Sequence, residues 1–306
     1  MEIISNTNDF YVERETAVAI GKFDGVHIGH RRLLEEILNK KEQGLLACVF
    51  TFEPSPSVFF GREEANYLTT KEEKRLLFER MGVDLLIEFP MNKENAAMEP
   101  ENFVKDILAE RMQTRFLVAG TDVSFGAGGR GNRELLEQLS AECGFEVRTI
   151  EKVKIEDRIV SSTLAKSLLE KGEIKELQRF LGMPYPLFGT VVHGKALGRT
   201  IGFPTVNILP PAEKLLPPLG VYLSEMIVGE KKYRGITNIG YKPTVTDEHV
   251  CGAETYLYDF NSDIYGEDVE LYLIDFLRPE RKFENLDALK AQLQIDIETG
   301  RRSNDQ

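Results

Sequence analysis

The sequence is poor in cysteine and has no long apolar run, and each absence excludes a class of protein. The three cysteines, Cys48, Cys143 and Cys251, are far apart and form neither a C-x-x-C pair nor a zinc-binding spacing. We interpret them as reduced, buried thiols. No apolar run approaches the roughly 18 residues of a membrane-spanning helix. The first ten residues include acidic side chains and lack an apolar core, so we expect no signal peptide and a cytoplasmic location.

Basic residues are also fewer than acidic residues. The chain has 50 acidic and 38 basic residues and a formal net charge of −12, which argues against a general nucleic-acid-binding protein. An acidic protein that handles nucleotides must concentrate its positive potential locally. With 306 residues the chain is long enough for two domains, each with its own core. Nothing in the sequence points to a membrane or to an obligatory protein partner.

The first 150 residues alternate predicted strands and helices. Strands are predicted over residues 18–20, 45–52, 83–89, 115–120 and 145–150, and helices over 30–41, 70–82 and 132–143 and from Pro100 onward. Thr70 and Glu73 form a predicted capping box. This order predicts a doubly wound parallel sheet, in which ligands bind at the carboxyl ends of the strands.

One such strand end carries the most informative segment, VAIGKFDGVHIGH, at residues 18–30. Gly21 and Gly25 allow a sharp turn and a close approach of the backbone to a ligand. His27 and His30 stand where the strand gives way to a helix, beside unpaired backbone N–H groups and the positive end of the helix dipole, a place that binds phosphate. Two imidazoles there can donate hydrogen bonds to a triphosphate and stabilise the charge that develops during attack at phosphorus.

The string G-x-F-D-G-V-H-x-G-H in this segment resembles the FAD synthetase module of bacterial bifunctional riboflavin kinase/FMN adenylyltransferases, within the H-x-G-H nucleotidyltransferase superfamily. The resemblance implies a Rossmann-like domain. It also implies an ATP site whose residues in this segment are Gly21, Phe23, Asp24, Gly25, His27 and His30.

Residues 159–166, IVSSTLAK, match the superfamily element S-S-T-x-x-R/K. Serines at a helix start are ordinarily N-caps, but the resemblance implies that Ser161, Ser162 and Lys166 hold the triphosphate. The FAD synthetase pattern commonly ends in Ile-Arg, whereas this chain has Ala-Lys. Lysine keeps the charge and loses the planar fork of arginine.

A second stretch of the resemblance covers residues 120–126, where the family usually reads G-x-D-F-x-F-G. Asp122 and Phe125 match and are implied flavin contacts, whereas Val123 replaces an aromatic residue. The following GAGGRG, residues 126–131, formally satisfies G-x-G-x-x-G, but TDVSF separates it from the preceding strand. We interpret it as a mobile glycine-rich loop near the substrate rather than as a dinucleotide fingerprint.

The pattern changes after Gly182 and Pro184 to short strands, turns and one late helix. Strands are predicted over residues 221–228, 232–239, 255–260 and 269–276, and a helix over 286–297. This composition predicts a small closed or nearly closed antiparallel barrel with a terminal helix. We therefore expect two domains, residues 1–182 and residues 183–306.

Residues 189–195, GTVVHGK, formally fit the P-loop pattern, but Ala196 follows and glycines break any helix. The longer string GTVVHGKALGRTIGFPTVNI, residues 189–208, resembles the flavokinase element G-x-V-x-x-G-x-x-x-G-R-x-x-G-F-P-T-x-N. The resemblance implies an ATP site formed by Gly194, Gly198, Arg199, Gly202, Thr205 and Asn207. It also implies that Thr205 and Asn207 hold Mg²⁺, a cation that prefers oxygen donors.

Glu254 is placed at the start of a strand that supplies, in flavokinases, the general base for the riboflavin 5′-hydroxyl. The resemblance thus implies an enzyme that converts riboflavin to FMN in its C-terminal domain and FMN to FAD in its N-terminal domain, with ATP as co-substrate of both reactions. Two alternatives stay open at this point. The N-terminal half could transfer a nucleotide to another phosphate, or the chain could be a flavin-responsive regulator with degraded catalysis.

Overall fold

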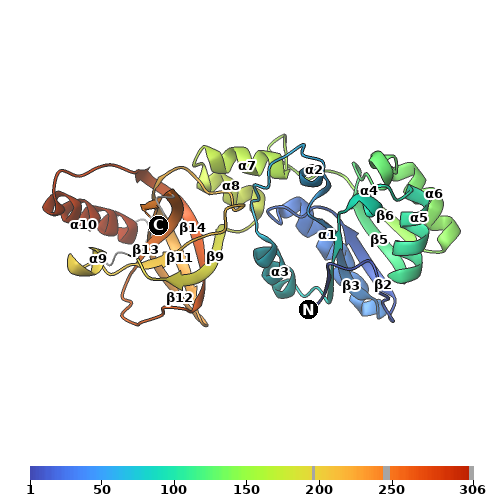
Figure 1. Ribbon diagram of the computed structural model, residues 1–306, viewed down its shortest axis with the longest axis horizontal. Helices are drawn as coiled ribbons and strands as arrows, with labels where there is room; N and C mark the ends of the chain where they lie inside the picture. Colours follow the sequence, from blue (N-terminus) through green and yellow to red (C-terminus); the bar gives the residue numbers. More distant parts are fainter. Residues whose placement is uncertain (195–196, 244–248, 303–306) are drawn as a thin grey trace. The chain divides into compact units, whose positions relative to one another are not determined.

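The computed structural model describes residues 1–194, 197–243 and 249–302 (Figure 1). The chain divides into two compact units. The first contains Met1–Tyr67 and Lys74–Ser162, and the second contains Leu68–Glu73 and Thr163–Gln306. This division is structural, so the functional boundary expected between residues 182 and 183 stays a prediction.

The first unit is built on a six-stranded parallel sheet with the strand order β1-β4-β3-β2-β5-β6. The strands are β1 (Glu2–Ser5), β2 (Thr16–Ile20), β3 (Leu46–Glu53), β4 (Leu85–Pro90), β5 (Thr114–Gly120) and β6 (Glu146–Ile150). All five residues of β2 are buried, as expected for a central parallel strand with both faces covered. The predicted doubly wound class is confirmed.

Helices cover both faces of this sheet (Figure 1). They are α1 (Ile28–Asn39), α2 (Pro56–Phe59), α3 (Lys71–Arg80), α4 (Lys93–Ala96), α5 (Pro100–Asn102) and α6 (Arg133–Cys143), with the 3₁₀ turns η1 (Lys40–Gln43) and η3 (Ala127–Gly129) and the π-helical η2 (Phe103–Arg111). Val18 and Ile20 of β2 join a core cluster with η2 and α6. Their neighbours Ala17 and Ala19 point to the other face, where α1 packs on β2.

Several local details differ from the sequence-based expectations. Helix α1 begins at Ile28, two residues earlier than predicted, because His27 caps it. The edge strand β1 was not predicted, since it is short and its first two residues are exposed. The helix predicted from Pro100 is a short α-turn that continues as the π-helical η2, whose Phe103 and Ile107 are buried as expected.

A hairpin of β7 (Lys154–Ile155) and β8 (Arg158–Ile159) precedes helices α7 (Ser162–Glu170) and α8 (Ile174–Leu181). Beyond them lies a closed antiparallel barrel with the strand order β10-β13-β12-β11-β14-β9. Its elements are β9 (Tyr185–Val192), α9 (Leu197–Thr200), β10 (Val206–Ile208), β11 (Gly220–Val228), β12 (Lys231–Pro243), β13 (His249–Leu257), β14 (Asp268–Pro279) and the terminal α10 (Leu286–Arg302). The predicted barrel with a terminal helix is confirmed.

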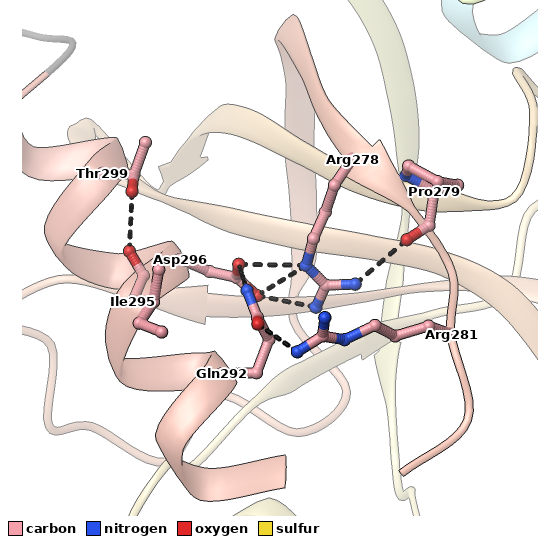
Figure 2. A network of polar contacts seen from close by, with 7 residues as sticks. All are labelled: Arg278, Pro279, Arg281, Gln292, Ile295, Asp296 and Thr299. Carbon is pink, nitrogen blue, oxygen red and sulfur yellow. Dashed lines mark hydrogen bonds and ion pairs between the residues drawn. The ribbon is translucent and has the colours of Figure 1, made fainter. Parts of the chain in front are cut away.

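Helix α10 is attached to the end of β14 by a polar network (Figure 2). The guanidinium of Arg278 donates to both carboxylate oxygens of Asp296, at 2.7 to 3.1 Å. Gln292 donates to the same carboxylate at 2.7 Å and accepts from Arg281. Asp296 is only 2% exposed, so the paired arginine compensates a buried charge.

The second unit also includes a segment from the N-terminal half of the sequence. Thr70 and Glu73 form the predicted capping box. The Glu73 carboxylate, in addition, accepts from the Phe188 backbone N–H of β9 at 3.0 Å and pairs with Lys214 at 2.6 Å. Lys214 also donates to the Leu68 carbonyl. Both charged side chains are almost completely buried, so each depends on the other for compensation.

Candidate active sites

The first candidate site is the turn between β2 and α1, at the carboxyl edge of the sheet. Phe23, Gly25 and Val26 all have positive φ angles, of 53°, 83° and 41°. Such a backbone is strained for phenylalanine and more so for a β-branched valine. The buried side chains of Phe23 and Val26 hold it in place, since neither is measurably exposed. The sequence therefore forces an unusual turn directly before the two histidines.

The two imidazoles lie stacked, with ring centroids 3.6 Å apart and planes 10° from parallel. Nδ1 of His27 accepts a hydrogen bond from the His30 backbone N–H at 3.2 Å and so caps α1. A neutral His27 must then carry its proton on Nε2, which is left as a donor. Gly29 makes this arrangement possible, because a Cβ atom there would lie 3.2 Å from the His27 ring.

Burial keeps both imidazoles neutral near pH 7. It lowers the pKa of His27 to about 4, against a smaller opposing effect of its backbone hydrogen bond. The pKa of His30 is lowered well below its usual range, first by burial and then by electrostatic interaction with His27 and Lys74. The pair thus offers N–H dipoles rather than full charges to a ligand. Nδ1 of His30 is buried and has no hydrogen-bond partner within the described residues.

The structure brings one of the predicted phosphate-binding serines to this turn. Ser162 Oγ donates to the Asp24 carbonyl at 2.8 Å, which ties the start of α7 to the glycine turn. Ser161 precedes it and is partly buried, and Asp24 is itself 9% exposed. Lys166 is partly buried on α7 and falls in the second unit, so its role at the imidazole pair stays a prediction.

The two predicted flavin contacts occupy different environments. Asp122 is exposed and pairs with Lys152 at 2.8 Å. Phe125 is 3% exposed and its ring centroid lies 5.7 Å from that of Phe103 in the core. A ligand contact stays a prediction for both, and Phe125 has a packing role in addition. The glycine-rich loop after it is anchored by a bridge between Phe125 and Gly131.

The second candidate site lies on the barrel face that α10 covers. Strand register places Glu254 directly between Asn207 of β10 and Asn238 of β12. Asn238 pairs in turn with Val221, which belongs to the cluster under α10 with Ile297. Paired residues share a sheet face, so the three polar side chains line one surface. The expectation that Glu254 begins its strand is wrong: it lies inside β13, since Gly252 and Ala253, which lack strand-typical side chains, still pair with β12.

Thr205 adds a hydroxyl to this surface. Its Oγ1 donates to Glu254 Oε1 at 2.6 Å, so the loop before β10 is tied to β13. A cavity of about 470 Å³ opens beside Thr205. Its lining combines apolar and aromatic side chains with polar ones and comes from Val191, Pro204–Val206, Leu257 and residues 260–265. A cavity of this size and lining can take a planar ring next to the polar cluster.

Glycines leave the room that this cluster needs. A Cβ atom at Gly194 would lie 2.6 Å from the Asn207 amide nitrogen, and one at Gly198 would collide with the Phe203 carbonyl. Gly202 has a φ of +92°, which favours glycine. The predicted ATP-site glycines are therefore explained locally by packing. Arg199 lies in α9, and its side chain is outside the described part of the structure.

The donors at this second site fit a hard divalent cation. Thr205 Oγ1 and the Glu254 carboxylate are 2.6 Å apart, and Asn207 is the register partner of Glu254. Hydroxyl, amide and carboxylate oxygens are the donors that Mg²⁺ takes together with water and phosphate. No cluster of three or more His, Cys, Asp or Glu side chains that could hold a metal occurs within the described residues.

Sequence reasoning missed two residues that the structure places at these sites. Asn238 flanks Glu254, and the signal was its position in the stretch GITNIGYKPT. Lys74 is 9% exposed, and its charge acts on His30. Nothing in the local sequence distinguishes Lys74 from the other charged residues of α3. Only the fold brings it to the turn.

The described residues thus contain two candidate polar sites, one at a strand-to-helix turn and one on a barrel, and the comparisons with known families assign each region to a class of transferase. Residues 10–164 match the family model of FAD synthetase, and residues 181–304 match that of riboflavin kinase. Within the described residues, no helix combines the length and the apolar character needed to cross a membrane.

The comparisons with individual proteins agree with these matches. The chain is 36% identical over 293 residues to the bifunctional riboflavin kinase/FMN adenylyltransferase of Listeria monocytogenes, covering 95% of this chain and 93% of the relative. The corresponding protein of Escherichia coli K12 is 36% identical over 287 residues, covering 93% and 91%. A crystal structure described as a macrolide-efflux protein from Streptococcus pneumoniae has a TM-score of 0.86, 31% identity and 98% coverage of both chains. The present chain belongs to the family of bifunctional riboflavin kinase/FMN adenylyltransferases.

Proposed function

We propose that this chain makes FAD from riboflavin in two steps, each in its own unit. The barrel unit transfers the γ-phosphoryl group of ATP to riboflavin and forms FMN. The α/β unit transfers AMP from a second ATP to FMN and forms FAD and pyrophosphate. The observation that carries the proposal is that two family models match in tandem and that each matched region contains one of the two polar sites described above.

For the kinase step we propose Glu254 as the general base. It takes the proton of the riboflavin 5′-hydroxyl while the new O–P bond forms, and the bond from the γ-phosphorus to the bridging oxygen breaks to release ADP. The half-buried carboxylate is held by the hydroxyl of Thr205, which fixes its orientation. The cavity beside Thr205 would take the adenine ring, so that the phosphates lie against the polar cluster.

Thr205 and Asn207 are the proposed holders of Mg²⁺ in this unit. A bound magnesium ion would offset the negative charge of the phosphates. The protein's part is to present Thr205 Oγ1 and the Asn207 amide oxygen beside Glu254. Gly194 and Gly198, where no Cβ atom would fit, belong to the glycine-rich loop proposed to close over the ATP phosphates.

For the adenylyl step no general base is needed, because the FMN phosphate is already an anionic nucleophile. One of its oxygens attacks the α-phosphorus of ATP, and the bond to the leaving pyrophosphate breaks. We propose that His27 and His30 donate hydrogen bonds to the charge that develops, as neutral imidazoles with fixed rings. Asp24, Gly25 and Ser162 would complete the ATP site from the turn and from α7.

The substrates would then be riboflavin, FMN and ATP, and a cytoplasmic location would follow because ATP is abundant there. Efflux, the description of the pneumococcal structure, is not carried over, since both family models and the curated relatives name transferases. Adenylylation of another phosphate and a purely regulatory role are disfavoured for the same reason.

Chromatographic analysis of riboflavin incubated with ATP and Mg²⁺ tests the proposal. The expected result is that FMN appears first and FAD follows. Conversion of FMN to a different nucleotide product would support the other nucleotidyltransferase function, and flavin binding without any product would support a regulator.

A further inference from the structure

We propose that Lys74 is a phosphate-binding residue of the adenylyl-transfer site. This inference rests on the proposed function and adds a residue to it. Lys74 lies in α3, outside both the glycine turn and the serine-rich start of α7. The proposal supplies what the imidazole pair lacks, which is a full positive charge.

The position of Lys74 follows from aromatic packing. Phe78, four residues later on the same face of α3, is fully buried, and its ring lies 5.5 Å from that of Phe23 in the glycine turn. The Phe23 ring in turn lies 5.1 Å from that of His30. Lys74 lies one turn earlier on this face, with its side chain tilted toward the start of the helix. Its positive charge contributes to the lowered pKa of His30, after burial and His27.

The ammonium group of Lys74 lies near the carboxylate of Glu53. Lys74 Nζ is 3.9 Å from Glu53 Oε2, which is longer than a hydrogen bond. Glu53 is the last residue of β3, and β3 also accepts a hydrogen bond from Gly21 N–H through the Phe50 carbonyl. The lysine therefore lies at the carboxyl edge of the sheet beside the turn, where ligands of such sheets bind.

The electrostatics favour a phosphate ligand. Lys74 is 9% exposed and Glu53 is a loose partner, so its charge is poorly compensated. The neighbouring imidazoles are neutral, and Nδ1 of His30 is buried without a partner in the described part of the chain. A polyphosphate would give this cation close charge-assisted hydrogen bonds. Because lysine acts as a point charge, we assign it to the β- and γ-phosphates that leave as pyrophosphate.

The test is steady-state kinetics of the full chain in both directions of the adenylyl step. Lys74→Met keeps the alkyl stem and removes the charge. It should raise the KM for ATP in FAD formation, and the KM for pyrophosphate in the reverse reaction, by roughly tenfold to a hundredfold, as expected for loss of a hydrogen bond to a charged group. The KM for FAD in the reverse reaction should change little. Lys74→Arg should recover most of the loss.

Two controls separate phosphate binding from a structural role. FMN formation from riboflavin by the same polypeptide reports whether the barrel unit of the variant is folded, and an unchanged KM for FAD in the reverse reaction reports the same for the α/β unit. Lys105→Met removes another lysine of this unit that pairs with a glutamate, Glu142, at 3.7 Å, and should leave both KM values unchanged. Glu53→Gln removes the competing carboxylate and should lower the KM for pyrophosphate, opposite in sign to Lys74→Met.

The outcomes are distinct. If the unmodified chain forms no FAD, the proposed function fails. If the unmodified chain is active and Lys74→Met retains both KM values within about twofold, the assignment of Lys74 is overturned. A similar increase of the KM for pyrophosphate in Lys74→Met and in Glu53→Gln would also overturn the assignment of Lys74, because two partners of a structural ion pair are expected to behave alike.

Discussion

His27 serves folding and chemistry with the two nitrogens of one ring. Its Nδ1 caps α1 by accepting from His30 N–H, and the opposite nitrogen is left to donate to a ligand. The sequence correctly located this residue at the junction of strand and helix. It could not give the stacking of the rings or the depth of their burial, because these depend on Phe23 and on the strained turn.

The buried imidazole makes stability depend on pH in a defined direction. The pKa of His27 is about 4 in the folded chain and about 6.5 when unfolded. As the pH falls through this window, the unfolded chain binds the proton and the folded chain does not. The free energy of unfolding should therefore fall, by up to about 3 kcal/mol for this group.

His27→Asn is the matched variant, since asparagine also caps helices but does not titrate. Urea unfolding at pH 7 and pH 4 should give a smaller pH dependence for the variant than for the unmodified chain. Equal pH dependence would mean that His27 is not buried as a neutral ring.

At the residue scale, prediction was most successful where a motif is local. Gly25 and His27 do lie in the turn before α1, and the distant Ser162, from a second local motif, donates to the Asp24 carbonyl in this turn. Lys74 was missed because its approach to the turn depends on α3 packing through Phe78 on Phe23. Periodicity shows which helix face is apolar, but it does not show which strand end a charged side chain will reach.

Among the elements, the terminal helix depends on one buried ion pair. Asp296 accepts from Arg278 and Gln292 (Figure 2), and Arg278 is largely covered as well, at 18% side-chain exposure. Asp296→Asn leaves the guanidinium with a neutral partner. We expect the free energy of unfolding to fall by about 3 kcal/mol, as measured by urea denaturation.

An exposed pair between Arg301 of the same helix and Asp259, which follows β13, provides the control. Asp259 and Arg301 lie 3.0 Å apart with side chains 81% and 51% exposed. Asp259→Asn should change stability by less than about 0.5 kcal/mol; asparagine also tolerates the positive φ of 55° found there. Similar losses in both variants would show that the Arg278 pair is not a buried anchor.

The predicted helices and strands matched the structure better in the α/β unit than in the barrel. In the α/β unit the hydrophobic periodicity and the helix caps are regular. Strand β13 was predicted to begin at Thr255 and begins at His249, and it ends at Leu257. Gly252 and Ala253 lack the bulky side chains that indicate a strand, yet pairing with β12 on one side and β10 on the other holds this backbone extended.

At the scale of the whole molecule, the barrel unit depends on residues 68–73 from the N-terminal half. Lys214 is buried against Glu73 and donates to the Leu68 carbonyl. A fragment of residues 183–306, the second domain expected from the sequence, retains Lys214 and lacks its partners Leu68 and Glu73. Burial without Glu73 would leave an uncompensated cation.

Lys214→Met should therefore act with opposite signs in two backgrounds. In the full chain it isolates the Glu73 carboxylate and should lower the free energy of unfolding by about 3 kcal/mol. In the 183–306 fragment it removes the unpaired charge and should raise the urea midpoint. Destabilisation in both backgrounds would mean that the fragment replaces the missing partners.

The central claim is that one chain performs two successive reactions at two separate sites, and product analysis of two variants tests it most directly. With riboflavin and ATP, His30→Ala should accumulate FMN without FAD, and Glu254→Gln should form neither. With FMN and ATP, Glu254→Gln should form FAD at the rate of the unmodified chain. A mixture of the two variants should make FAD from riboflavin through released FMN. FAD formation by His30→Ala, or FMN formation by Glu254→Gln, at the unmodified rate would contradict the account.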